Sequence, residues 1–306
     1  TELQPIQRYV TDCVESVGTA GIRLIGLHGG YLTLNPADPD FKLTRLGSVR
    51  INDQNPTEAQ AFSFTEGSFI QLPYWVYMDS PNSCEAGCSF DSMYAPLHRE
   101  DPGGERSIEA QLDRYVDAHL KECIAEFGPF VARGLKFKEL GDVKTTSYVT
   151  EKNIVLLVEW PVEVSLPDGA VGELTRFTSD LDVSMRAIHD LAIYLSGLTI
   201  ESNYLEKNTL NIIAAYSAFD PNRLPPIRAF EVAVPPGTVS WRRDKVEELL
   251  KSILSFNIPL LEVYNTANFK ELPSSTNLIV QGMQNAMVLP NVLPTLHLSV
   301  NFMYLG

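Results

Sequence analysis

The most regular hydrophobic pattern of the chain lies near its beginning. Apolar residues recur every three or four positions over residues 4–25, which predicts a helix with one apolar face. Pro5 suits the first turn of this helix, where its missing amide hydrogen costs nothing. Gly29 and Gly30 predict a tight turn at the end of the helix, and the apolar residues 31–34 predict a short strand after it.

The same spacing predicts a second long helix over residues 107–127, with Ser107 as its N-cap. Strict alternation of apolar and polar residues over 153–166 then predicts a half-buried strand. Pro161 interrupts this strand, and because proline cannot donate to a ladder we expect an edge or a bulge there. Further strands are predicted at 135–140, 144–149 and 174–185, and a third helix at 186–205.

Two other parts of the chain are less regular. Residues 35–104 are rich in turn-forming residues and predict a loop-rich insertion with short strands at 48–51, 61–64 and 69–77. After a soft boundary near Lys207, short apolar runs are separated by prolines. These runs predict strands at 210–218, 228–234, 260–264, 277–281 and 296–305, and one short helix at 242–255.

Together these elements predict an α+β fold in which an antiparallel sheet is backed by amphipathic helices. We expect two domains. Residues 1–206 form the first, which contains the insertion 35–104. Residues 207–306 form a second, mainly β domain, and we expect its C-terminus to be truncated because the last strand ends without a turn.

The chain is acidic, which narrows the possible partners. Its 306 residues include 24 basic and 38 acidic ones, for a formal net charge of -14. An acidic surface repels phosphate, which argues against nucleic acid and against docking on anionic lipid. No stretch reaches the roughly 18 apolar residues of a membrane span. Thr1 is not an initiator methionine, so we expect a processed or trimmed chain.

Four cysteines form an even set, which allows three pairings in an oxidising compartment. Cys13 and Cys123 each lie at the centre of an apolar helix face, so both should point into one core; the alternative to a bond is two small buried thiols. Cys84 and Cys88 lie in a polar loop, where they would close a tight turn. Their spacing differs from that of redox motifs, and no nearby Cys or His pair completes a zinc site. We therefore favour two disulfides, Cys13–Cys123 and Cys84–Cys88.

The sequence contains no catalytic constellation that we can recognise. It has no Walker loop, no dinucleotide fingerprint and no Gly-x-Ser-x-Gly turn. The five histidines are isolated from one another, at His28, His98, His119, His189 and His297. Carboxylate pairs such as Glu122 with Glu126, and Glu247 with Glu248, fall on the polar faces of predicted helices, where we interpret them as solvated charge. The sequence thus predicts no enzyme, no cofactor and no metal site.

One aromatic cluster in the insertion is the most suggestive binding surface. It consists of Phe69, Tyr74, Trp75 and Tyr77. The alternative is a strand buried on both faces, and we favour that alternative.

Two blocks near the start of the chain resemble a known family. Tyr9-Val-Thr-Asp-Cys-Val-Glu15 and Gly21-Ile-Arg-Leu-Ile-Gly-Leu-His-Gly-Gly-Tyr31 resemble the opening of uncharacterised surface proteins of small-genome (DPANN) archaea. Shorter similar blocks lie at 72–75, 119–124 and 300–305. The resemblance implies a signal or membrane anchor upstream of Thr1, export, and oxidation of the two helix cysteines. It implies no activity.

These observations predict an exported cell-surface structural protein without a catalytic role. Its most specific form is a self-assembling subunit of an extracellular filament, tube or sheath. Its partners would be further copies of the chain, joined through loops or exposed strands such as 296–305, with membrane contact only through the missing anchor. One alternative is a monomeric adhesin or carbohydrate-binding module that uses the aromatic cluster. Another is a hydrolase whose carboxylates converge only in the fold.

Overall fold

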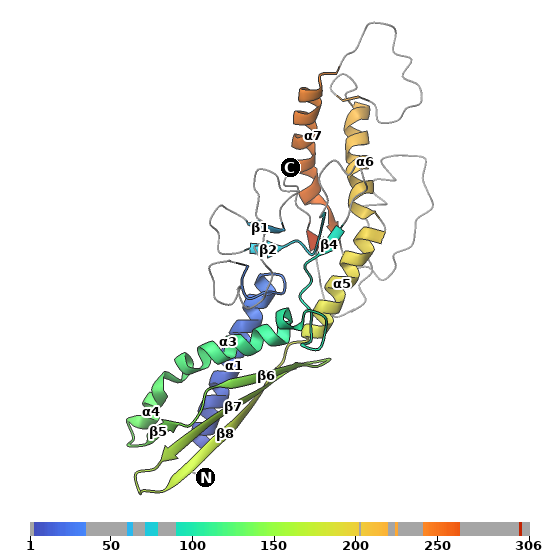
Figure 1. The fold of residues 1–306 in the computed structure, drawn as a ribbon. Helices are drawn as coiled ribbons and strands as arrows, with labels where there is room; N and C mark the ends of the chain where they lie inside the picture. The colour runs from blue at the N-terminus through green and yellow to red at the C-terminus, as the bar shows by residue number, and fades with distance from the viewer. Residues whose placement is uncertain are drawn as a thin grey trace, which may run out of the picture. The chain divides into compact units, whose positions relative to one another are not determined.

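The computed structural model describes residues 3–34, 60–63, 71–78, 90–201, 203–219, 224–225, 241–263 and 300–301 (Figure 1). Its helices are α1 (Gln4–Leu27), η2 (Gly104–Arg106), α3 (Ile108–Ile124), η3 (Ala125–Phe127), α4 (Gly128–Val131), α5 (Met185–Glu201), α6 (Tyr204–Phe219), α7 (Arg243–Asn257) and η4 (Ile258–Leu260). Its strands are β1 (Ala61–Ser63), β2 (Gln71–Pro73), β3 (Val76–Met78), β4 (Phe90–Ser92), β5 (Lys136–Glu139), β6 (Lys144–Val149), β7 (Ile154–Ser165), β8 (Val171–Leu181), β9 (Glu262–Val263) and β10 (Val300–Asn301).

The chain divides into two compact units, and the division falls inside α5. The first unit comprises residues 1–52 and 57–190, and the second comprises residues 53–56 and 191–306. The sequence placed this boundary later, near Lys207. Since α5 contributes to both units, no loop separates them at this point.

The first unit is built on a four-stranded antiparallel sheet with β7 at its centre. β5 and β6 pair with one edge of β7, and β8 pairs with the other edge. Pro161 lies in the gap between the β5 and β6 ladders, where the register with β8 also shifts. A missing amide hydrogen breaks no ladder bond there, so the prediction of a bulge at Pro161 is confirmed.

One face of this sheet carries the core. The inward residues Val158, Trp160, Val162 and Val164 are each at most 1 % exposed, as their alternation predicted. Helix α1 packs on this face against β7 and β8, and α3 packs against both α1 and β6 (Figure 1). These helices and strands match the predicted ones closely, and the α+β class is confirmed.

The end of α1 combines one confirmed prediction with one that is wrong. Gly29 and Gly30 have φ angles of 65° and 106°, so they form the predicted tight turn. Residues 31–34, however, are not a strand. The Leu32 amide donates to Gln111 Oε1 at 2.9 Å, and its carbonyl oxygen lies 2.7 Å from His28 Nδ1. Side chains therefore satisfy the backbone groups that a neighbouring strand would otherwise pair with.

In the second unit, the prediction of a strand over 210–218 is wrong, because these residues belong to α6. A short apolar run does not distinguish a strand from a helix by itself, and here it continues a helix that begins at Tyr204. Helix α6 packs against α7, and Asn257 Nδ2 donates to the Tyr216 hydroxyl at 3.2 Å.

The described part of this unit is mainly helical, so the expectation of a mainly β domain is wrong there. Its strands in the described ranges are β9 and β10, which pair with each other. They lie within the predicted strands 260–264 and 296–305, whereas the strands predicted at 48–51, 228–234 and 277–281 lie outside the described residues.

Candidate functional site

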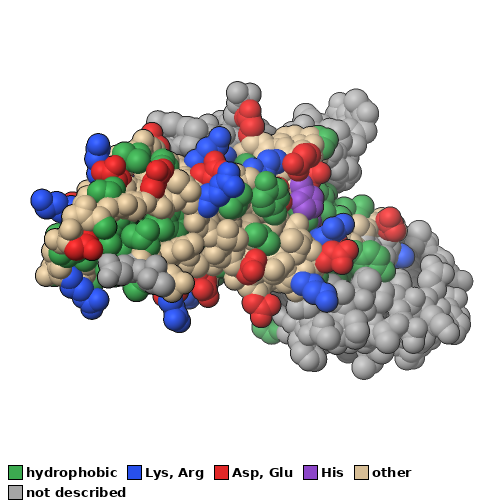
Figure 2. All heavy atoms as spheres, turned by 90° about the horizontal axis from the view of Figure 1, so that it is seen from below, with side chains coloured by type: hydrophobic (Ala, Val, Ile, Leu, Met, Phe, Trp, Pro, Cys, Tyr) green, Lys and Arg blue, Asp and Glu red, His purple; other side chains and the backbone are tan. Residues whose placement is uncertain are grey.

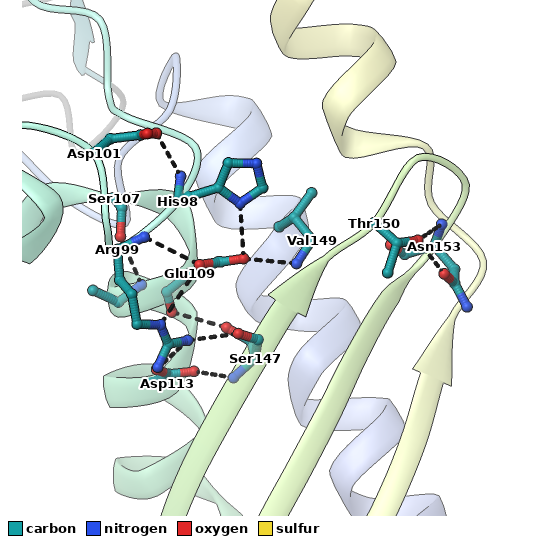
Figure 3. A network of polar contacts seen from close by, with 11 residues as sticks. His98, Arg99, Asp101, Ser107, Glu109, Asp113, Ser147, Val149, Thr150 and Asn153 are labelled. Atoms are coloured by element: carbon teal, nitrogen blue, oxygen red, sulfur yellow. Dashed lines mark hydrogen bonds and ion pairs between the residues drawn. The ribbon is translucent and has the colours of Figure 1, made fainter.

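Three carboxylates on one side of α3 face the outer edge of β6, and we call them the carboxylate ladder: Glu109, Asp113 and Asp117. Figure 3 shows Glu109 and Asp113 of the ladder. Each accepts one outward-pointing backbone amide of the strand. The donors are Val149 to Glu109 Oε1 at 2.8 Å, Ser147 to Asp113 Oδ1 at 2.6 Å, and Thr145 to Asp117 Oδ1 at 2.7 Å. Side chains of α3 thus complete the edge of the sheet.

The ladder works because two regular spacings almost coincide. Four residues of helix rise about 6.0 Å, and two residues of strand rise about 6.6–6.8 Å. Carboxylates at i, i+4 and i+8 can therefore follow alternate amides of a strand over a short distance. The mismatch reaches roughly 1.5 Å over the two intervals between the first and last pair. It limits such a ladder to a few pairs.

Glu109 is the most enclosed member, with only 3 % of its surface exposed. Besides the amide of Val149, it accepts the Arg99 amide at 3.1 Å on Oε2. His98 Nδ1 lies 3.1 Å from Oε1 and must carry a hydrogen, because an ionised carboxylate can only accept. Both carboxylate oxygens are therefore occupied by donors from the protein.

Arg99 supplies positive charge beside the ladder. Its Nη2 lies 3.1 Å from Asp113 Oδ2 and donates to the Ser147 carbonyl oxygen at 2.5 Å. Its Nε lies 3.6 Å from Glu109 Oε2. The guanidinium carbon also lies 5.7 Å from the ring centroid of Tyr148, on the exposed face of the sheet. One arginine thus partly balances two carboxylates.

The two aspartates of the ladder are harder to ionise than free carboxyls. Burial raises the pKa of Asp113 from 3.8 to about 6, because the loss of hydration outweighs the hydrogen bonds from Ser147 and the nearby Arg99 charge. Burial also raises the pKa of Asp117, against the hydrogen bonds from Thr145 and the charge of Lys144. These two aspartates therefore titrate closer to neutrality than surface carboxylates do.

Chemically, the ladder is suited to holding structure. Its carboxylate oxygens accept backbone amides, and the Ser147 hydroxyl donates to the backbone carbonyl oxygen of Glu109 at 3.0 Å. No group of three or more His, Cys, Asp or Glu residues is arranged to hold a metal ion in the part of the chain that the structure describes. The contacts of the carboxylate ladder attach α3 to the edge of the sheet.

The predicted disulfide between Cys13 and Cys123 is present, with their Cα atoms 5.8 Å apart. It joins α1 to α3, the helix that carries the carboxylate ladder. Cys84 and Cys88 lie outside the described residues, so their pairing stays a prediction.

The described members of the aromatic cluster, Tyr74, Trp75 and Tyr77, are each half-buried, and Phe69 lies outside the described residues. Trp75 Nε1 donates to the carbonyl oxygen of Gly29 at 3.0 Å, and its ring packs edge-on against Tyr94 at 4.8 Å. These contacts hold the turn that ends α1, which is a packing role.

The histidines and the predicted surface carboxylates do not gather into one site in the described part of the chain. His28 and His189 contact backbone carbonyl oxygens, and His119 pairs with Glu122 on the surface of α3. His297 is not among the described residues. The carboxylates predicted as solvated charge (Glu122, Glu126, Glu247 and Glu248) are all exposed.

The sequence contained a signal for the ladder that our reading missed. Glu109, Asp113 and Asp117 lie at i, i+4 and i+8, and like charges at this spacing destabilise an isolated helix. A row of three therefore indicates donors from outside the helix. The helix alone disfavours these like charges, whereas the folded chain stabilises them with amides of β6. A conflict of this kind in a sequence indicates a tertiary contact.

These features define a disulfide-linked α+β protein in which buried carboxylates of α3 accept backbone amides of β6. Comparison with protein-family models, with curated proteins and with solved structures found no match. The resemblance to archaeal surface proteins therefore stays a prediction. None of the described helices combines the length and hydropathy needed to cross a membrane.

The face drawn in Figure 2 has acidic and basic side chains interspersed, with hydrophobic side chains between them. The described residues of that face therefore offer a polyanion no continuous basic patch.

Proposed function

We propose that this chain is an exported cell-surface structural protein that self-assembles. The proposal includes membership of the surface-protein family that the opening motifs resemble, and it assigns the chain no catalytic step.

The observation that carries the proposal is that the two edges of the sheet differ: side chains of α3 bind one edge, whereas the other has no strand partner among the described residues. The ladder occupies the amides of β6, which closes that edge to other strands. On the opposite side, β8 extends over 11 residues. Among the described residues, none outside β7 pairs with it as a strand. A long uncovered edge strand is a template for strand addition.

The disulfide supports the location. Disulfides persist in oxidising compartments outside the cytosol, and Cys13 and Cys123 are bonded. The aromatic alternative is weakened because Trp75 uses its ring and its Nε1 in packing. The hydrolase alternative is weakened because the buried carboxylates of the ladder accept backbone amides.

The test is to produce the full-length protein in cells that export it, and to follow it by protease treatment of intact cells and by negative-stain electron microscopy without reducing agent. We expect protease-accessible protein, oxidised at Cys13 and Cys123, in regular filaments, tubes or sheets. Protein that is protected inside the cell, or that forms only uniform single particles, would refute the proposal.

A further inference from the structure

The contacts of the carboxylate ladder determine which residues of β8 direct their backbone N–H and C=O groups out of the sheet. Thr145, Ser147 and Val149 donate away from β7, so their partners in β7 direct their own backbone groups toward β8. Those partners are Val158, Leu156 and Ile154, and they face Phe177, Ser179 and Leu181 of β8. The backbone groups of the alternate residues, Arg176, Thr178 and Asp180, therefore point out of the sheet.

These three residues are also accessible. Arg176, Thr178 and Asp180 are exposed, whereas Phe177, Ser179 and Leu181 between them are buried. No hydrogen bond from another described segment reaches the outward backbone groups of the three. With respect to the described part of the chain, the second half of β8 is therefore a regular and open edge.

From this edge we infer that β8 pairs antiparallel with β8 of a second copy of the chain, with Thr178 opposite Thr178 on the twofold axis. The inference rests on the proposed self-assembly and names its contact. The two four-stranded sheets would then form one continuous eight-stranded sheet, with outward amides and carbonyl oxygens exchanged across the axis.

Among the twofold registers that place an outward-pointing residue opposite itself, charge favours this one. Three twofold registers place an outward-pointing residue opposite itself, centred on Arg176, Thr178 or Asp180. The first puts two arginines face to face and the last puts two aspartates face to face, and like charges directly opposite are unfavourable. Only the register centred on Thr178 places Arg176 opposite Asp180, and it does so twice.

The exposed side chains agree with this arrangement. Residues that lie opposite each other in an antiparallel pair point to the same face, and Arg176 and Asp180 both lie on the exposed face. Arg176 already lies 3.4 Å from Glu159 on that face, with 71 % of its side chain exposed. It can therefore reach a partner's carboxylate while it stays near Glu159.

A twofold contact closes on itself and forms a dimer, not a filament. The dimer is thus the repeating unit of the proposed assembly, and growth requires a second contact elsewhere on the chain. The pairing of β8 can therefore be tested separately from the growth of the polymer.

The first test uses Thr178→Pro in the full chain. Proline at this position removes an outward amide and leaves the bonds to β7 intact, which edge strands tolerate. We expect at least a tenfold weaker dimer by sedimentation equilibrium, and Thr178→Val, which keeps the amide, should dimerise like the natural protein. A dimer that Thr178→Pro does not weaken, or a chain that remains monomeric throughout, would overturn the inference.

The second test exchanges the charges, in case the proline disturbs the fold. Asp180→Arg should weaken the dimer about tenfold, and the double variant Arg176→Asp/Asp180→Arg should restore most of the affinity. Loss without restoration would count against the register. Filaments that form unchanged in these variants would refute the β8 contact and leave the proposed function supported. Dimers that depend on β8, without assembly at the cell surface, would support the β8 contact and refute the proposed function.

Discussion

Replacing Glu109 by Gln tests whether the carboxylate ladder holds α3 to the sheet. The two oxygens of Glu109 accept three N–H donors, from the ring of His98 and from the amides of Arg99 and Val149. A glutamine amide has one oxygen and one NH2 group. In either orientation, its NH2 group faces a donor and leaves at least one buried N–H without an acceptor.

The size of the effect follows from these contacts. An unsatisfied buried amide costs about 1–3 kcal/mol, and a hydrogen bond to a charged group contributes about 1.5–3 kcal/mol. The Arg99 guanidinium keeps Asp113 as an ion-pair partner, so the loss of its ion pair with Glu109 adds little to the cost. We expect Glu109→Gln to lower the free energy of unfolding by about 3 kcal/mol.

The assay is urea unfolding of the oxidised protein at neutral pH, followed by circular dichroism. Glu122→Gln is a matched control, since it makes the same chemical change on the same helix at a side chain that is 75 % exposed. It should cost less than about 0.5 kcal/mol. A loss below about 1 kcal/mol for Glu109→Gln, or equal losses for both variants, would show that the ladder does not stabilise the fold.

Three further outcomes are expected. The pKa of Asp113 is raised to about 6 in the folded state, so its stabilising contribution is complete below about pH 4 and is lost as pH rises through 6. Urea unfolding should therefore give a free energy of unfolding for the natural protein that falls by about 2–3 kcal/mol relative to that of Asp113→Asn between about pH 4 and pH 7. A difference between the two proteins that does not change with pH would contradict the raised pKa. Replacing both Cys13 and Cys123 by Ala should lower the free energy of unfolding by about 2–5 kcal/mol in the same assay, and an unchanged value would mean that the bond adds nothing. At Gly104 an added Cβ would overlap the Arg99 carbonyl, so Gly104→Ala should lower the melting temperature through a loss of about 1–3 kcal/mol, whereas Gly26→Ala, with open space around it, should not lower it.

Local pattern was sufficient where one element determines its own burial. The alternation in β7 identified its inward residues, and the periodicity of α1 and α3 placed Cys13 and Cys123 in one core. Pro161 could be assigned to a bulge or an edge because its chemistry excludes an ordinary ladder position.

Local pattern failed where the partners come from elsewhere in the chain. Residues 31–34 have the composition of a strand, but Gln111, 79 residues from Leu32, takes the amide that a strand would have paired. The ladder depends on a match between a helix and a strand that are 28 to 40 residues apart. For 210–218, helix and strand were both compatible with the apolar run, and packing against α7 favours the helix.

The bond between Cys13 and Cys123 also makes a covalent ring of the chain between them, and this ring contains the whole insertion 35–104. A protease that cuts the backbone once inside the ring separates no fragment, because both pieces stay joined through the two sulfur atoms. The insertion can therefore be nicked, lengthened or exchanged while α1 remains attached to α3. For a protein exposed to extracellular proteases, a single cut within residues 35–104 would leave its framework in one piece.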